Sequence, residues 1–181
     1  MKKIVIGNTL KLWFSALCLL PCLLMAEPVD HTIHQVRLRC EGEFENVSKY
    51  QRAADAPLNN PVRAMISDIC RSNGMDITVA RTEYMPDTPM DLNDLVKRAA
   101  ADMGRRPGVV KPMQSTGVVT VSQIPAKRLS FSAKLEGKAI TLESVYFLKG
   151  QTLWTIQIAF ETDEERRKKA EQILATIRYQ P

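Results

Sequence analysis

The side chains of this sequence best suited to covalent or metal chemistry are its four cysteines and two histidines. Cys18 and Cys22 lie in an apolar N-terminal stretch, whereas Cys40 and Cys70 lie in the more polar remainder of the chain. In an oxidising compartment a cysteine pair forms a disulfide, and a bond closing this loop would stabilise the fold by about 3 kcal/mol. The sequence therefore predicts a Cys40–Cys70 disulfide in an exported protein, with two buried free thiols as the alternative.

The histidine pair is a weak candidate for metal binding. His31 and His34 both lie near the start of the polar region. Residues i and i+3 of a strand point to opposite faces, so a flexible polar segment is a simpler interpretation than a shared metal. The spacings of cysteine and histidine also match no zinc pattern. The sequence therefore predicts no metal site.

Motifs of nucleophilic catalysis and of nucleotide binding are missing from the sequence. There is no Gly-x-Ser-x-Gly elbow, no phosphate-cradling glycine loop and no dinucleotide fingerprint. Carboxylates such as Asp87 and Asp91 fit ordinary turn and cap positions. We therefore expect a non-enzymatic protein without a cofactor, and an enzyme stays only as the third hypothesis.

Basic side chains are concentrated between residues 105 and 138, where seven cations accompany the single acid Glu136. A surface of this charge attracts acidic partners or anionic surfaces. Lysines scattered along strand edges, where they block aggregation, are the alternative explanation. The residues predicted to contact a protein partner are Arg105, Arg106, Lys111, Lys127 and Arg128.

The first 26 residues have the three-part layout of a secretory signal peptide. Lys2 and Lys3 precede a mainly apolar run, which ends at the small residue Ala26. This run is too short for a spanning helix, so we expect no membrane-spanning segment after cleavage. Lipid anchoring through Cys22 is the alternative, although the preceding Pro21 does not suit lipoprotein processing. The sequence predicts a signal peptide over residues 1–26 and a single exported domain over 27–181, located in the periplasm.

Cleavage of the signal peptide changes the charge of the protein. The full chain has a net charge of +5, and Lys2, Lys3 and Lys11 leave with the peptide while no acid does, so +2 remains. Most of the apparent basicity therefore belongs to the leader. Because the remaining net charge is small, we expect the protein not to bind nucleic acid.

The segment that joins Cys40 to Cys70 contains a strand, a loop and a helix in this interpretation. The strand covers residues 36–44, and the polar stretch over 45–60 is typical of a loop. Between Pro61 and Asn73 the apolar residues recur at helical spacing and turn Cys70 inward. An Asn-Gly pair then predicts the end of this helix.

The rest of the chain alternates between strands and helices. We expect strands over residues 76–84, 118–124, 128–135, 139–148 and 152–160, a helix over 91–104, and a terminal helix opened by a Thr162/Glu165 capping box. Tight turns join the last four strands into an antiparallel meander. The sequence therefore predicts an α+β fold, in which an antiparallel β-sheet (meander) has helices packed on both faces as an α/β/α sandwich.

This order of elements resembles the PsbP-like family of α/β/α sandwiches, which includes the bacterial DcrB proteins. The resemblance covers about the last three-fifths of the chain, residues 76–181. It rests on a strand (DITVARTEY), a helix (DLNDLVKRAAADM), the meander segments QIPAKRLSFSA and KGQTLWTIQIAF, and a terminal helix ending in ILATIRY. The N-terminal third, with Cys40 and Cys70, departs from the family pattern. The resemblance implies an adaptor, a stabilising subunit or a binding module, and it assigns no role to any single residue.

Two hypotheses of function follow from these observations. The first is an exported accessory or adaptor protein that binds another envelope or secreted protein. The alternative is a periplasmic inhibitor or immunity protein that acts against a toxin or hydrolase. A neighbouring gene for a secreted hydrolase would favour the second, and neighbours that encode an envelope machine would favour the first.

Overall fold

A computed structural model of the chain describes residues 27–52 and 61–181. The predicted signal peptide, residues 1–26 with Cys18 and Cys22, lies outside the described residues. So do residues 53–60, which belong to the predicted loop. Among the helices that are described, none is long and apolar enough to cross a membrane.

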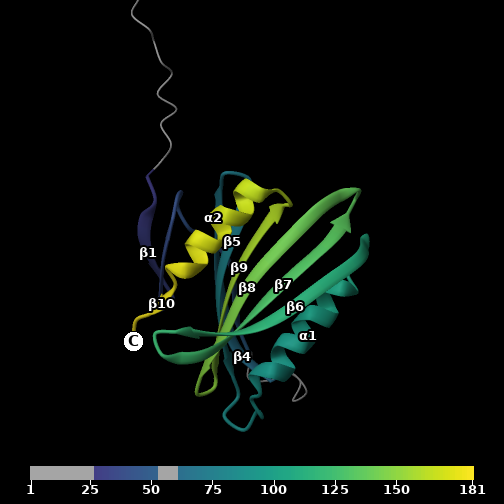
Figure 1. Ribbon diagram of the computed structural model, residues 1–181. Helices are drawn as coiled ribbons and strands as arrows, with labels where there is room; N and C mark the ends of the chain where they lie inside the picture. The colour runs from purple at the N-terminus through teal and green to yellow at the C-terminus, as the bar shows by residue number, and fades with distance from the viewer. Residues whose placement is uncertain (1–26, 53–60) are drawn as a thin grey trace, which may run out of the picture.

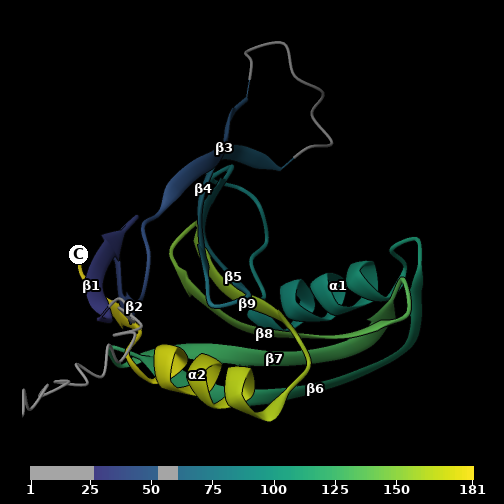
Figure 2. The same cartoon turned by 90° about the horizontal axis from the view of Figure 1, so that it is seen from above.

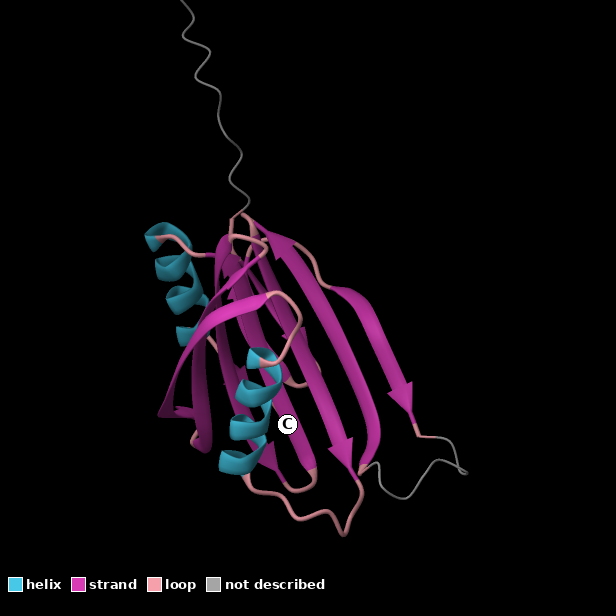
Figure 3. Cartoon of the chain, turned by 90° about the vertical axis from the view of Figure 1, so that its right-hand side faces the viewer, coloured by secondary structure: helices cyan, strands magenta, loops and turns pink. Residues whose placement is uncertain are grey.

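Two antiparallel sheets and two helices form the described part of the chain, and the long strands lie side by side (Figures 1 and 3). The large sheet has the order β3-β4-β5-β9-β8-β7-β6 and the small sheet the order β1-β2-β10. The elements are β1 (Val29–Ile33), β2 (Val36–Cys40), β3 (Glu45–Gln51), β4 (Val62–Ser72), β5 (Met75–Tyr84), α1 (Leu92–Gly104), β6 (Val109–Val121), β7 (Ile124–Leu135), β8 (Lys138–Lys149), β9 (Thr152–Glu161), α2 (Glu164–Ala175) and β10 (Arg178–Tyr179). The predicted α+β class with an antiparallel sheet is confirmed.

Strands β6 to β9 form the predicted meander, in which each strand pairs with the next one. The turn residues Ser122 and Gln123 have φ angles of 46° and 68°, and Glu136 and Gly137 have φ angles of 50° and 85°. Two successive positive φ angles are typical of the type I′ turn, whose twist matches that of the paired strands. The first strand of the meander differs from the prediction at both ends. β6 begins at Val109 rather than at residue 118, and it ends at Val121, so that Ile124 and Pro125 already belong to β7.

The predicted helix from Pro61 to Asn73 is wrong, because this segment forms the strand β4. β4 pairs with β3 on one side and with β5 on the other. Its buried residues Ser67 and Cys70 are three positions apart, so they lie on opposite faces of the sheet. Asn73 and Gly74 have φ angles of 51° and 70°, so they form the hairpin turn into β5. An Asn-Gly pair suits a helix end and a hairpin equally well. Cys70 is buried, as expected.

The N-terminal region contains more strands than the sequence predicted. Residues 45–51 of the predicted loop form β3, an edge strand with no fully buried side chain. The predicted strand over 36–44 ends at Cys40, just before Gly42 turns the chain with a φ of 86°. β1 was not predicted at all, and it pairs with β2 through a turn at His34 and Gln35.

Both helices begin at an aspartate. Asp91 caps α1 as predicted, and its carboxylate accepts two backbone N–H bonds of the first turn. The predicted capping box of α2 is wrong, because Asp163 is the N-cap and accepts a hydrogen bond of 2.8 Å from the backbone N–H of Arg166. Thr162 instead shares a hydrogen bond of 2.8 Å with the hydroxyl of Thr141.

The hydrophobic core consists of two clusters, one on each face of the large sheet. Tyr146 and Phe147 are neighbours in β8, so their side chains point to opposite faces, and each belongs to a different cluster. The α1-side cluster contains Val96, Ala100, Met103, Leu129, Phe131, Tyr146 and Leu153. The α2-side cluster joins α2 and β2 to the apolar residues of β5, β8 and β9 (Figure 2).

Three aromatic side chains attach the small sheet to the large one. Phe147 and Trp154 stack with ring centroids 5.2 Å apart, and Tyr179 of β10 lies edge-on to both rings. The indole N–H of Trp154 also donates a hydrogen bond of 2.7 Å to the backbone oxygen of His34. Aromatic pairs in these geometries add to the free energy of burial, so the small sheet is an integral part of the α2-side core.

Candidate functional site

The two cysteines lie where the small sheet meets the large one. Cys40 ends β2, Cys70 lies in β4, and both are buried free thiols that interact with each other. Burial raises the pKa of Cys40 to about 12 and also raises the pKa of Cys70. Cys70 donates a hydrogen bond of 3.1 Å to the backbone oxygen of Glu41. A Cβ at Gly42 would lie 2.9 Å from the Cys70 sulfur, so only glycine lets the backbone pass this close to the thiol. Whether the two cysteines form the predicted disulfide stays a prediction.

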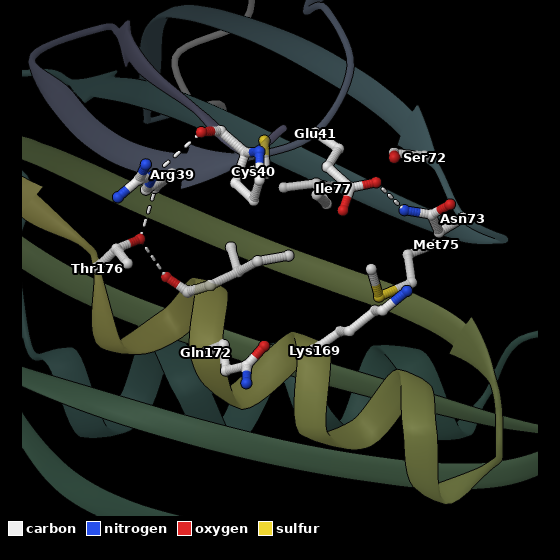
Figure 4. Close-up of a pocket in the computed structure, with 12 residues that line it drawn as sticks. Arg39, Cys40, Glu41, Ser72, Asn73, Met75, Ile77, Lys169, Gln172 and Thr176 are labelled. Atoms are coloured by element: carbon white, nitrogen blue, oxygen red, sulfur yellow. Dashed lines mark hydrogen bonds between the residues drawn. The ribbon is translucent and has the colours of Figure 1, made fainter. Parts of the chain in front are cut away.

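A cleft of about 260 Å³ opens beside Cys40, between β2, the β4–β5 turn and α2 (Figure 4). Its floor is apolar and consists of the buried side chains of Cys40, Met75, Ile77 and Ile173. Its rim is polar and is formed by Arg39, Glu41, Asn73, Lys169, Gln172 and Thr176. An apolar floor inside a polar rim is the usual composition of a binding pocket.

Hydrogen bonds between rim residues hold the cleft in shape. The Thr176 hydroxyl accepts a hydrogen bond of 2.9 Å from the backbone N–H of Arg39 and donates one of 2.6 Å to the Ile173 oxygen. On the opposite side, the Asn73 amide donates to the Glu41 carboxylate. These bonds connect β2 to both α2 and the β4–β5 turn. The cleft is therefore formed by the native packing of three segments that lie far apart in the sequence.

Sequence patterns did not point to the cleft residues, because each one looks ordinary in its own segment. The rim and floor come from β2, from β5 and its preceding turn, and from α2. The single local signal was Gly42, whose lack of a side chain marks a close approach of the backbone.

The two histidines fix the β1–β2 hairpin to the rest of the molecule. His34 Nε2 and Asp68 Oδ2 are hydrogen-bonded and connect the hairpin turn to β4, and Asn46 Nδ2 donates to the second Asp68 oxygen at 3.2 Å. The His31 ring packs edge-on against Phe44 with a centroid separation of 5.3 Å. The prediction of a flexible polar segment around these histidines is therefore wrong.

Arg128 is the centre of a polar network on the α2 side of the sheet. Its guanidinium donates to Glu143 of β8 at 2.8 and 3.0 Å and to Glu171 of α2 at 2.5 and 2.8 Å. Ser130 Oγ donates a further bond of 2.5 Å to Glu143, which is only 5 % exposed. The hydrogen bonds from Arg128 lower the pKa of Glu171, and those to Glu171 and Glu143 raise the pKa of Arg128. A second cavity of about 370 Å³ borders this network.

The five basic residues predicted as partner contacts do not form one patch. Arg105 and Arg106 follow α1, shortly before β6 begins at Val109. Lys127 pairs with Val118, which lies nine residues further along β6, a distance of about 30 Å along the strand. Lys127 and Arg128 are neighbours in β7 and point to opposite faces.

Of the remaining two residues, Lys111 belongs to β6 and Arg128 is engaged by the two glutamates. Partner contact by this set stays a prediction. In the described ranges, no group of three or more histidine, cysteine or acidic residues is arranged to hold a metal ion.

No family model and no curated protein sequence matches this chain, but solved structures match its fold. The class that these structures indicate is the PsbP-like fold. Cyanobacterial PsbP (CyanoP) from Synechocystis sp. PCC 6803 is 9% identical, with a TM-score of 0.56, and the match covers 87% of this chain and 95% of that one. The chain thus has a weak PsbP-like fold relationship, as its sequence resemblance implied.

Two further structures are similar over most of their length. A protein of unknown function, PA94 from Pseudomonas aeruginosa, described as a putative regulator, is 14% identical, with a TM-score of 0.44 and coverage of 81% and 95%. LpqN of Mycobacterium tuberculosis, involved in cell envelope biogenesis, is 14% identical, with a TM-score of 0.42 and coverage of 85% and 90%. At these identities the likeness concerns the fold alone.

Proposed function

We propose that this protein is an exported, non-enzymatic accessory protein that binds another protein of the cell envelope. In this proposal, cleavage after Ala26 releases residues 27–181 into the periplasm as a single domain with an α/β/α sandwich arrangement. The PsbP-like fold relationship is compatible with a binding role, but a fold hosts many functions. The proposal therefore rests on the cleft between β2 and α2.

The cleft supports protein binding because its chemistry suits the insertion of an apolar side chain. Met75, Ile77 and Ile173 offer an apolar floor, and burial of a partner side chain there would remove apolar surface from water. The charged rim residues already have partners, since Glu41 accepts from Asn73 and Lys169 pairs with Glu165 at 3.3 Å. Acid–base catalysis requires a titratable group that is free to reach a substrate, whereas Glu41 and Lys169 are engaged by these partners.

A pull-down from envelope extract with two matched variants tests this proposal. Gln172→Trp places a large ring at the mouth of the cleft, and Lys168→Trp places the same ring at an exposed position of α2 that does not line it. We expect the wild type and Lys168→Trp to capture the same envelope protein, and Gln172→Trp to capture at least about tenfold less. Capture of no protein at physiological salt, or equal capture by both variants, would refute the role of the cleft.

The captured protein also separates the two hypotheses of function. A secreted hydrolase or toxin whose activity falls on binding would favour the inhibitor or immunity protein. A component of an envelope machine would favour the adaptor.

The predicted basic contacts enter the proposal as a source of long-range attraction for an acidic partner. Charge reversal at Arg105 and Arg106, which are exposed and follow α1, should slow association and weaken its dependence on salt. The dissociation rate should change little, because these residues lie away from the cleft. Surface plasmon resonance with the captured partner measures both rates, and an unchanged association rate would remove these residues from the proposal.

We further propose that Cys40 and Cys70 form a disulfide after export. Their thiols are already in contact, and the bond would join β2 to β4 beside the cleft. Intact mass measured before and after reduction tests this, since reduction of one disulfide adds two hydrogens. An unchanged mass would show that the thiols stay free.

A further inference from the structure

The long strand β6 lies at one edge of the large sheet and is open on its outer side (Figure 1). In the described part of the chain, β6 pairs with β7 only. Its side chains from Pro112 to Val118 are all exposed, and Met113 and Val118 reach 71% and 74% exposure. A row of backbone donors and acceptors is therefore presented together with exposed apolar side chains.

From Met113 to Val121 this edge lacks the protection that edge strands usually have, whereas a bulge between Val110 and Met113, together with Lys111 and Pro112, interrupts only its beginning. Natural edge strands carry charged residues, bulges or prolines that prevent pairing with another chain. The ten residues from Pro112 to Val121 contain no charge, and the one proline stands at the beginning of this run. At the opposite edge of the same sheet, β3 carries Glu45 and Lys49. β6 is thus the edge suited to strand addition.

Gly117 in the middle of β6 is not explained by contacts within the chain. A glycine inside a strand weakens it and marks a bulge, a bend or the close approach of another backbone. β6 pairs with β7 in continuous register from Met113 to Val121, so no bulge lies there. A Cβ at Gly117 would meet no atom within 4 Å. The backbone at Gly117 is therefore open for a second strand to approach it.

We propose that β6 is the interface between two copies of this protein, paired antiparallel about a twofold axis at Gly117. The large sheet would then continue from one copy into the other. The axis places Met113 opposite Val121, Ser115 opposite Val119, Thr116 opposite Val118, and Gly117 opposite itself.

The second copy fits this edge better than a charged partner strand does. In this register every apolar side chain of one copy meets an apolar or small side chain of the other, and no like charges face each other. Lys111 falls outside the paired run. An isologous interface of this kind is self-complementary by symmetry. The dimer is independent of the proposed cleft, which lies between β2 and α2.

Sedimentation velocity of the exported protein tests the dimer. We expect a dimer for the wild type and for Val47→Glu, which adds the same charge to the exposed edge strand β3. Gly117→Glu places two carboxylates opposite each other and should raise the dimer dissociation constant at least about 100-fold. A monomeric wild type, or equal dissociation of both variants, would overturn the proposal.

A cross-linking variant gives a positive result that does not depend on a loss of folding. Paired residues of neighbouring antiparallel strands have Cα atoms about 4.5–5.5 Å apart, which a disulfide spans. Gly117→Cys should therefore form a covalent dimer under mild oxidation, and Val47→Cys should stay monomeric on a non-reducing gel. Equal cross-linking of both variants, or none with Gly117→Cys, would contradict the proposed register.

Discussion

The two helices are attached to the same sheet by different interactions. α1 fully buries Val96, Ala100 and Met103 against the sheet. α2 buries only Ala170 and Ile173, and the ion pair of Arg128 with Glu171 supplements its packing. Apolar burial depends little on pH or salt, whereas an ion pair at the surface depends on both. α2 also borders both cavities, so the attachment of the helix beside the cleft depends more on charge than that of α1 does.

The largest effect is expected from Arg128→Ala, which removes the polar attachment of α2. Glu143 would remain buried without its guanidinium partner, and we expect the free energy of unfolding to fall by about 3 kcal/mol. Urea denaturation followed by circular dichroism measures this loss. The double variant Arg128→Met with Glu143→Met is the control, because replacing both charges should restore most of the stability. A loss below about 1 kcal/mol for Arg128→Ala would mean that water already screens this network.

The matching change on the other side is Val96→Ala, which leaves a small cavity under α1. Val96 is 2% exposed, and its truncation should cost about 2 kcal/mol. Unlike the loss from Arg128→Ala, this one should be the same at low and high salt, because no charge is involved. Denaturation at two salt concentrations measures the difference. If the loss of stability depended on salt to the same extent in both variants, the two helices would not differ in how they are attached.

A smaller effect is expected from Asp163→Ala at the start of α2. The variant removes the hydrogen bond to the Arg166 N–H and should cost about 1 kcal/mol. Asp163→Asn keeps an acceptor at this position and serves as the control. Hydrogen exchange should show the loss in the amides of α2 before those of α1. Uniform faster exchange in both helices would show that they unfold as one unit.

The smallest effect is the pH dependence due to Glu171. Its hydrogen bonds with Arg128 lower its pKa below the usual value of 4.5 in the folded protein. A group whose pKa is lowered by folding stabilises the fold above its unfolded pKa, and this contribution is lost as pH falls through the folded pKa. Below pH 4.5, stability should therefore fall more steeply in the wild type than in Glu171→Gln. Parallel pH profiles would show that α2 gains nothing from this charge.

The elements that sequence analysis predicted correctly are those with one consistent local pattern. From Arg128 to Ser132 the residues of β7 alternate, with Leu129 and Phe131 buried and their neighbours less so. α1 combines an aspartate cap with an apolar stripe. β4 was mistaken for a helix because it lies in a curved sheet and packs on both faces, so its apolar residues do not alternate. The Asn-Gly turn that follows did not resolve the ambiguity.

The candidate sites were less predictable than the fold because they depend on register and on docking. Arg128 meets Glu143 across a strand pair and Glu171 from a helix, and neither partner is near it in sequence. The local excess of positive charge therefore suggested that Arg128 belongs to an open basic surface, whereas in the structure it is paired with Glu143 and Glu171. The cleft likewise exists only after β2 and α2 pack together.

The pairing of β5 with β9 has a consequence for the order of folding. Adjacent hairpins close over turns of a few residues, but this pairing brings Met75 opposite Phe160, with α1 and three strands in between. Closing a longer loop costs more entropy, so β5 and β9 should meet late. We expect φ-values of folding to be higher for contacts between β7 and β8 than for contacts between β5 and β9, and the reverse order would contradict this sequence of events. During synthesis, Ile77 and Val79 can pair with β4 but would lack the strand on their other side until β9 has emerged.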